Sequence, residues 1–193
     1  MTRLALLADL DRCTGCQACV VACKVQKQVP AGLSLIRLIQ VGPEGDFPAL
    51  GMYYLPLACQ HCGRPACAES CPEGAIRRAE NGVVTVEAGK CTGCGDCVGA
   101  CPYGAVVLDA VNRLARKCDL CVDLLSGGGR PPCICVCPGK ALQVLDLDDA
   151  AASAPVSGAG RRRRAERVAL LPSAGTDPGG RFVLTFQEWQ DRV

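Results

Sequence analysis

Short apolar segments alternate with polar, cysteine-rich turns along the first three quarters of the chain. Residues 6–10, 105–108 and 141–145 are apolar runs of the length of short strands. Asn81-Gly82 precedes the β-branched segment 83–86, which is typical of a tight hairpin turn. Residues 25–58 form a connection rich in proline and glycine, in which the pattern predicts one strand over residues 33–41.

The pattern changes after residue 149. Residues 150–166 are rich in Ala, Ser, Gly and Arg, which predicts a flexible linker. Its arginines, residues 161–164, are either solvated or directed at an acidic partner or lipid. Apolar positions alternate again at Phe182, Leu184 and Phe186, and Trp189 follows. We therefore expect residues 167–193 to be a docking tail that binds either this chain or a partner.

Composition and charge narrow the class of protein. Only one Trp, three Tyr and three Phe occur among 193 residues, which excludes a large aromatic core. A hydrophobic fraction of 49% with 21% charged residues excludes full disorder. The net charge of +2 predicts no nucleic-acid partner. No apolar run reaches the roughly 18 residues of a membrane span, and Asp9 interrupts the apolar start, so we expect no direct membrane span and no signal peptide.

Sixteen of the seventeen cysteines fall into four groups of four. The first and third groups share the spacing C-x2-C-x2-C-x3-C, the second has C-x4-C in its middle, and the fourth contains an eleven-residue insertion. The groups are Cys13, Cys16, Cys19 and Cys23; Cys59, Cys62, Cys67 and Cys71; Cys91, Cys94, Cys97 and Cys101; and Cys118, Cys121, Cys133 and Cys137. We expect the remaining Cys135 to be a small buried residue and not a ligand.

The spacing of the first and third groups is that of bacterial ferredoxins. Each such group gives three thiolates to one [4Fe–4S] cluster and its fourth thiolate to another. Four groups therefore predict two pairs and four [4Fe–4S] clusters. A disulfide framework needs an oxidising compartment, and zinc favours separated C-x2-C pairs, so both alternatives fit the spacing less well.

The repeated groups predict an α+β fold in which small hairpins and short helices surround inorganic cores. We expect the helices to start at the fourth cysteine of a group or just before it, with Pro72, Pro102 and Pro138 near helix ends or first turns. Metal ligation would supply much of the stability. Gly15, Gly93 and Gly95 either allow tight loops or bring backbone N–H groups close to cluster sulfur. His61, the only histidine, is expected to pack beside a cluster without ligating it.

The order of the four groups resembles the iron–sulfur electron-transfer subunits of the dimethyl-sulfoxide-reductase, polysulfide-reductase and formate-dehydrogenase type. The resemblance covers about residues 5–147 and rests on Arg12-Cys13-Thr14-Gly15-Cys16, Cys59-Gln60-His61-Cys62 with Pro65-Ala66-Cys67, Cys91-Thr92-Gly93-Cys94, Cys101-Pro102-Tyr103-Gly104-Ala105 and Lys117-Cys118-Asp119-Leu120-Cys121. The first group departs from the others because Cys23 is followed by Lys24 instead of proline, which is consistent with a helix that continues.

The resemblance implies the ligand sets, with the first group paired with the fourth and the second with the third. Cluster one would take Cys13, Cys16, Cys19 and Cys137; cluster two Cys118, Cys121, Cys133 and Cys23; cluster three Cys59, Cys62, Cys67 and Cys101; and cluster four Cys91, Cys94, Cys97 and Cys71. Each pair of clusters would lie in one ferredoxin-like lobe. The expected four-cluster domain is residues 1–149, with lobe one at 1–24 and 112–149, lobe two at 55–111 and a connection at 25–54.

The function that the resemblance implies is electron transfer without catalysis in this chain. Single electrons would pass through four clusters between a large catalytic subunit with a molybdenum or tungsten pterin and a quinone-reactive membrane anchor or a soluble carrier. One alternative is a freely diffusing polyferredoxin, or the polyferredoxin-like small subunit of a soluble tungsten aldehyde oxidoreductase or hydrogenase complex. The other is a non-redox metal scaffold or sensor. The chain is expected in the cytoplasm or at a membrane through a partner.

Overall fold

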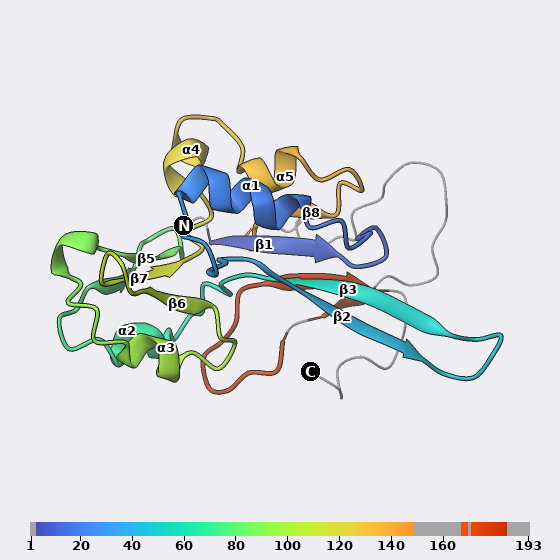
Figure 1. Ribbon diagram of the computed structural model, residues 1–193, viewed down its shortest axis with the longest axis horizontal. Helices are drawn as coiled ribbons and strands as arrows, with labels where there is room; N and C mark the ends of the chain where they lie inside the picture. Colours follow the sequence, from blue (N-terminus) through green and yellow to red (C-terminus); the bar gives the residue numbers. More distant parts are fainter. Residues whose placement is uncertain (1–2, 149–166, 170, 185–193) are drawn as a thin grey trace.

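The computed structural model describes residues 3–148, 167–169 and 171–184, and its elements are short (Figure 1). They are β1 (Leu4–Asp9), α1 (Ala18–Lys27), β2 (Arg37–Glu44), β3 (Gly51–Leu57), α2 (Ala66–Glu69), β4 (Ile76–Arg78), β5 (Val84–Val86), a 3₁₀ turn (Ala88–Lys90), α3 (Asp96–Ala100), β6 (Val106–Asp109), β7 (Leu114–Lys117), α4 (Val122–Ser126), α5 (Pro132–Cys135), β8 (Leu142–Asp146), β9 (Arg167–Ala169) and β10 (Arg181–Leu184). Helices and strands mix throughout, so the predicted α+β class is confirmed.

A four-stranded sheet with the order β8-β1-β10-β9 forms the centre of the fold. Its strand β1 is apolar and buried along most of its length, as expected of an interior strand with neighbours on both sides. β8 pairs with β1 antiparallel, whereas β10 pairs with it parallel, with Ala8 opposite Phe182. Helix α1 packs against α5, which in turn contacts β8 of this sheet (Figure 1).

The C-terminal segment lies against this same chain over its described residues. β10 is an inner strand of the central sheet, and both Phe182 and Leu171 are buried in the main core. The sequence left open whether the tail packs against this chain or against a partner, and residues 171–184 pack against this chain. The expected linker at 150–166, with its arginines at 161–164, and Trp189 lie outside the described residues.

Two small hairpins, β4–β5 and β6–β7, pack with α2 and α3 around a second core. This core consists of Cys67, Ile76, Val84, Cys97, Val106 and Ala115. The hairpin signal at Asn81-Gly82 is confirmed by the pairing of β4 with β5. The expected lobe boundary between residues 111 and 112 falls inside the β6–β7 hairpin, so β7 packs with the residues assigned to lobe two.

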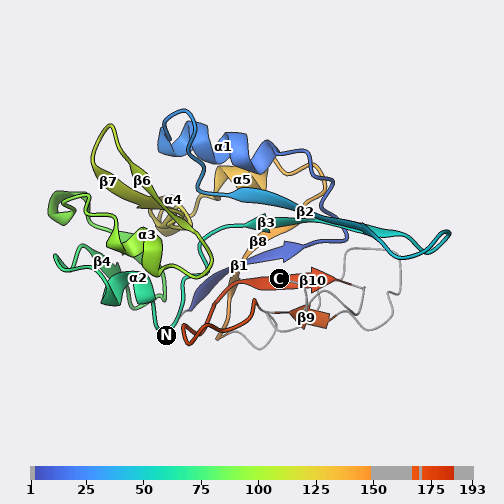
Figure 2. The same cartoon turned by 60° about the horizontal axis from the view of Figure 1, so that its bottom comes forward.

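The prediction of one strand in the 25–58 connection was incomplete. The structure has two strands there, β2 and β3, which form a long antiparallel hairpin. Its end projects from the molecule on the side opposite α2 and α3 (Figures 1 and 2). The sequence did not predict the second strand because residues 42–51 contain prolines and glycines. These residues form the turn of the hairpin and the register shift between its two strands. Within the described residues, no helix is long and apolar enough to cross a membrane.

Candidate metal centres

Each cysteine group begins with a tight loop, and in the first, second and fourth groups a backbone N–H of that loop points at the first sulfur. The residue two positions after the first cysteine has a left-handed backbone in every group: Gly15 (φ 72°), His61 (φ 44°), Gly93 (φ 71°) and Leu120 (φ 55°). The N–H groups of His61 and Leu120 lie 3.4 Å from the sulfurs of Cys59 and Cys118. Non-glycine residues in this conformation carry strain, which is common in loops that hold a functional group.

Glycine is needed at two of these positions for space as well as for conformation. A Cβ on Gly15 would lie 2.7 Å from the ring of Tyr54, and one on Gly93 would lie 2.5 Å from the carbonyl oxygen of Arg113. The Gly15 N–H also bonds the Cys13 sulfur, which lowers the pKa of a thiol that burial raises. Gly15 therefore serves both roles that the sequence left open.

One cysteine of each group lies on a helix and faces inward. Cys19, Cys67, Cys97 and Cys133 are each the second residue of a helix, in α1, α2, α3 and α5, and all four are buried. The expectation that helices start at the fourth cysteine is therefore wrong. Only α1 runs through a fourth cysteine, Cys23, whereas α2, α3 and α5 end before theirs.

The other three fourth cysteines begin a shared turn with the sequence C-P-x-x-A. In each turn the alanine N–H donates back to the cysteine sulfur, over 3.3 Å from Ala75 to Cys71, 3.4 Å from Ala105 to Cys101 and 3.2 Å from Ala141 to Cys137. The residue before the alanine is left-handed and is Gly74, Gly104 or Lys140. We missed this element from the sequence, although the repeated letters were a usable signal.

Twelve of the sixteen grouped cysteines line three cavities, four to each. Each cavity combines cysteines from two groups. We call them set two (Cys23, Cys118, Cys121 and Cys133), set three (Cys59, Cys62, Cys67 and Cys101) and set four (Cys71, Cys91, Cys94 and Cys97). The other four, Cys13, Cys16, Cys19 and Cys137, interact electrostatically and are called set one.

Exposure separates sets one and four from sets two and three, which we call the inner sets because protein covers them. Cys16 of set one and Cys94 of set four are exposed, whereas every cysteine of sets two and three is buried or half-buried. Cys135 lies outside all four sets. It is exposed, with its sulfur 3.9 Å from the Arg130 carbonyl oxygen, so the expectation that it is buried is wrong.

Burial keeps most of the inner thiols protonated when no metal is bound. Burial, and after it the neighbouring sulfurs, raises the pKa of the Cys23 thiol to about 11 and that of the Cys133 thiol to about 12. In set one, the Ala18 N–H lowers the pKa of the exposed Cys16 thiol. Metal binding at the inner sets must therefore release protons.

Sets two and three meet at a buried lysine. Lys117 is 5% exposed, and its Nζ donates to the carbonyl oxygens of Val84 and, over 2.8 Å, of Cys118. His61 Nδ1 accepts the N–H of Val84 at 3.0 Å, and burial, helped by Lys117, lowers the pKa of His61 well below its usual value. A neutral, buried His61 fits the packing role that the sequence predicted.

The arrangement suits polynuclear iron–sulfur groups. Four soft thiolates surround each of three cavities, and backbone N–H groups point at their sulfurs, which is the environment that holds and tunes such clusters. Among the described residues, no three Cys, His, Asp or Glu side chains converge as ligands of a single metal ion do. Fold and site together define a ferredoxin-type iron–sulfur protein.

Comparison with known proteins identifies the family. Residues 50–147 match the family described as 4Fe-4S dicluster domain, and residues 5–25 match the 4Fe-4S binding domain. The protein is 42% identical to the thiosulfate reductase electron transfer subunit PhsB of Salmonella typhi, over 75% of this chain and 76% of that protein. It is 36% identical to a subunit of the sulfite dehydrogenase of Allochromatium vinosum (95% and 83%) and 34% identical to a subunit of the anaerobic dimethyl sulfoxide reductase of Escherichia coli strain K12 (93% and 93%).

This chain therefore belongs to the family of 4Fe–4S electron-transfer subunits of oxidoreductase complexes, and it carries four [4Fe–4S] clusters. The resemblance seen in the sequence is thereby confirmed. Its work is electron transfer within a reductase-type complex.

Proposed function

We propose that sets one to four each hold one [4Fe–4S] cluster and that the chain relays electrons along them in that order. A bound cluster of this kind takes up and gives back one electron. The sharing of four thiols around each of three cavities is the single observation that carries this assignment. Each set draws its cysteines from two groups, as the exchange of fourth ligands requires.

The contacts between the sets support a linear order. Cys19 of set one and Cys23 of set two lie one turn apart on α1. Cys118 of set two and Cys59 of set three interact electrostatically, and Cys67 of set three lies in the same buried core cluster as Cys97 of set four. We take sets one and two as one lobe and sets three and four as the other.

The two exposed cysteines favour sets one and four as the ends of the relay. A partner can approach the sulfur of Cys16 or Cys94 closely, whereas protein covers the inner sets. We propose that a large catalytic subunit with a pterin-bound molybdenum or tungsten docks at set one, and that a membrane anchor or a soluble carrier exchanges electrons with set four.

The β2–β3 hairpin supports docking at the set-one end. Tyr54 of β3 packs against Gly15 in the first cysteine loop, so this hairpin projects from the same end. Beyond it, Phe47 is 88% exposed, Leu50 55% and Met52 52%. Apolar side chains on a projecting hairpin are typical of an interaction surface.

Native mass spectrometry with elemental analysis tests the proposed function. The chain, tagged and isolated from its source, should carry about sixteen iron atoms and retain a large subunit that contains molybdenum or tungsten. Sixteen iron atoms on a chain that is isolated alone would instead indicate a diffusing polyferredoxin-like carrier. A nickel-containing partner would indicate a hydrogenase complex, and zinc in place of iron would overturn the assignment.

The proposed docking role of the β2–β3 hairpin has its own test. Changing Phe47, Leu50 and Met52 together to serine should reduce retention of the catalytic subunit at least tenfold, while iron content stays unchanged because these side chains are exposed. Val111→Ser is the matched control, since Val111 is also exposed, at 83%, but lies in the β6–β7 hairpin. Equal retention by both variants would exclude the hairpin from this interface.

A further inference from the structure

The C-terminal segment 171–180, which we call the strap, crosses the loop of the second cysteine group. Three backbone bonds join them: Gly63 N–H to the Asp177 carbonyl oxygen (2.8 Å), Arg64 N–H to that of Thr176 (3.0 Å) and Gly179 N–H to that of Gln60 (2.8 Å). The strap therefore provides hydrogen-bond partners for backbone N–H and carbonyl groups in and next to the loop that carries Cys59 and Cys62. It lies outside the segments matched by the ferredoxin families.

Thr176 brings the strap into contact with set three. The residue is 4% exposed, lines the set-three cavity, and places its hydroxyl in hydrogen-bond contact with the Cys62 sulfur. Its Oγ1 also lies 2.8 Å from the hydroxyl of Tyr103, which follows the set-three residue Cys101 by two positions. When the Thr176 hydroxyl donates to a Cys62 thiolate, its oxygen can accept a hydrogen bond from Tyr103, whose single hydroxyl proton can go either to Thr176 or to the Pro172 carbonyl oxygen at 3.1 Å.

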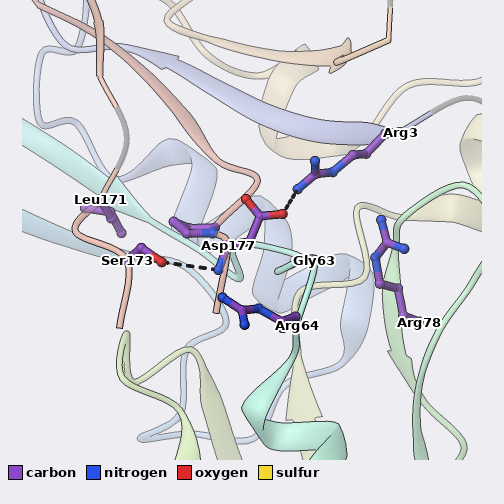
Figure 3. Close-up of a pocket in the computed structure, with 8 residues that line it drawn as sticks. Arg3, Gly63, Arg64, Arg78, Leu171, Ser173 and Asp177 are labelled. Atoms are coloured by element: carbon purple, nitrogen blue, oxygen red, sulfur yellow. Dashed lines mark hydrogen bonds and ion pairs between the residues drawn. The ribbon is translucent and has the colours of Figure 1, made fainter. Parts of the chain in front are cut away.

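The strap is fixed at both ends and at its middle. Leu171 is buried in the main core, and the strap continues into β10 of the central sheet. At the middle, the Asp177 carboxylate forms an ion pair with the Arg3 guanidinium at 2.9 Å. The backbone N–H of Asp177 donates a hydrogen bond to Ser173 Oγ at 3.4 Å (Figure 3). Asp177 lines a surface pocket together with Arg64 and Arg78, which Figure 3 also shows. The Asp177 carboxylate therefore lies among positively charged side chains.

We propose that Thr176 is a positioning residue of the relay, whose hydroxyl raises the reduction potential of the cluster held by set three. The inference rests on the proposed function. Reduction increases the negative charge on the cluster and its thiolates, so a donor to Cys62 stabilises the reduced state more than the oxidised one. A charged acceptor in a water-poor cavity strengthens this bond.

Redox titration of the four clusters, followed by electron paramagnetic resonance in the purified complex, tests the proposal. Thr176→Val removes the hydroxyl at nearly constant shape, and we expect one midpoint potential to fall while three stay unchanged and iron content is retained. Thr176→Ser keeps the hydroxyl and should restore the native potential. Ser173→Ala, in the same strap but away from set three, should shift none.

The outcomes separate this inference from the proposed function. The affected cluster should be the one whose signal changes in Cys62→Ser; a shift confined to another cluster would overturn the role of Thr176 while leaving a four-cluster relay intact. Four unchanged potentials in Thr176→Val, or equal shifts in the Val and Ser variants, would also overturn it. If Thr176→Val does not assemble, Tyr103→Phe, which removes the hydroxyl that contacts Thr176 and the Pro172 carbonyl oxygen, should give a smaller shift in the same direction, and the absence of that shift would count against the proposal.

Discussion

Cysteines that lie two positions apart in this chain have different surroundings. Cys137 begins a C-P-x-x-A turn and receives the Ala141 N–H at 3.2 Å, whereas Cys135 is exposed outside the four sets. The sequence distinguished them because Cys137, unlike Cys135, completes a C-x3-C spacing that is followed by proline. The exposure of Cys135 was not predictable, since it depends on how the end of α5 faces the solvent.

The contrast yields a prediction about iron content. Cys137→Ser should lose iron from set one, up to about a quarter of the total, because one of its four thiolates and its N–H···S bond disappear. Cys135→Ser should keep the full iron content. Iron analysis of both variants, purified without oxygen, is the measurement. Comparable losses would mean that Cys135 takes part in ligation.

At the scale of elements, the sequence predicted those helices and strands whose position depends on a local pattern, such as a turn motif or an apolar run. The β4–β5 hairpin follows from Asn81-Gly82, and β1 and β8 follow from their apolar runs. The second strand of the β2–β3 hairpin was missed because its pairing partner, rather than its own composition, holds it in place. The helix starts were misplaced because the third cysteine, not the fourth, must point inward from the first turn.

The C-P-x-x-A turn makes a prediction about stability. Lys140 has a left-handed backbone (φ 50°) where the two equivalent turns have Gly74 and Gly104. An L-residue in this conformation costs roughly 1–2 kcal/mol, and glycine costs about 0.5–1 kcal/mol in chain entropy, so Lys140→Gly should stabilise the protein by about 0.5–1 kcal/mol.

Thermal melting of the loaded protein at one fixed scan rate measures the effect. Lys140→Ala is the matched control, because it removes the same charge and keeps the Cβ, and it should give no gain. Stabilisation by alanine as large as by glycine would show that the lysine charge, and not backbone strain, is responsible.

At the scale of the whole molecule, contacts distant in sequence decide what the motifs leave open. β1 pairs with β10, and the strap reaches set three from more than 70 residues beyond Tyr103, as the Tyr103–Thr176 contact shows. No local pattern encodes this pairing, so the sequence predicted an apolar tail without its target. The sharing of each cluster's four thiolates stays a prediction of the family resemblance, which rests on the way iron–sulfur geometry restricts the thiolates that can share a cluster.

The difference in exposure between the end and inner sets predicts the order in which the isolated chain loses its clusters. An iron chelator with a mild oxidant should release about half of the iron in a fast phase, because Cys16 and Cys94 are open to solvent and the inner sets are covered. Thiol alkylation, read by peptide mass spectrometry during that phase, should label Cys16 and Cys94 before Cys59 and Cys118. Cys135 should be labelled before any iron leaves, which makes it an internal control. Release in one phase, or early labelling of Cys59 or Cys118, would contradict a relay whose ends lie at sets one and four.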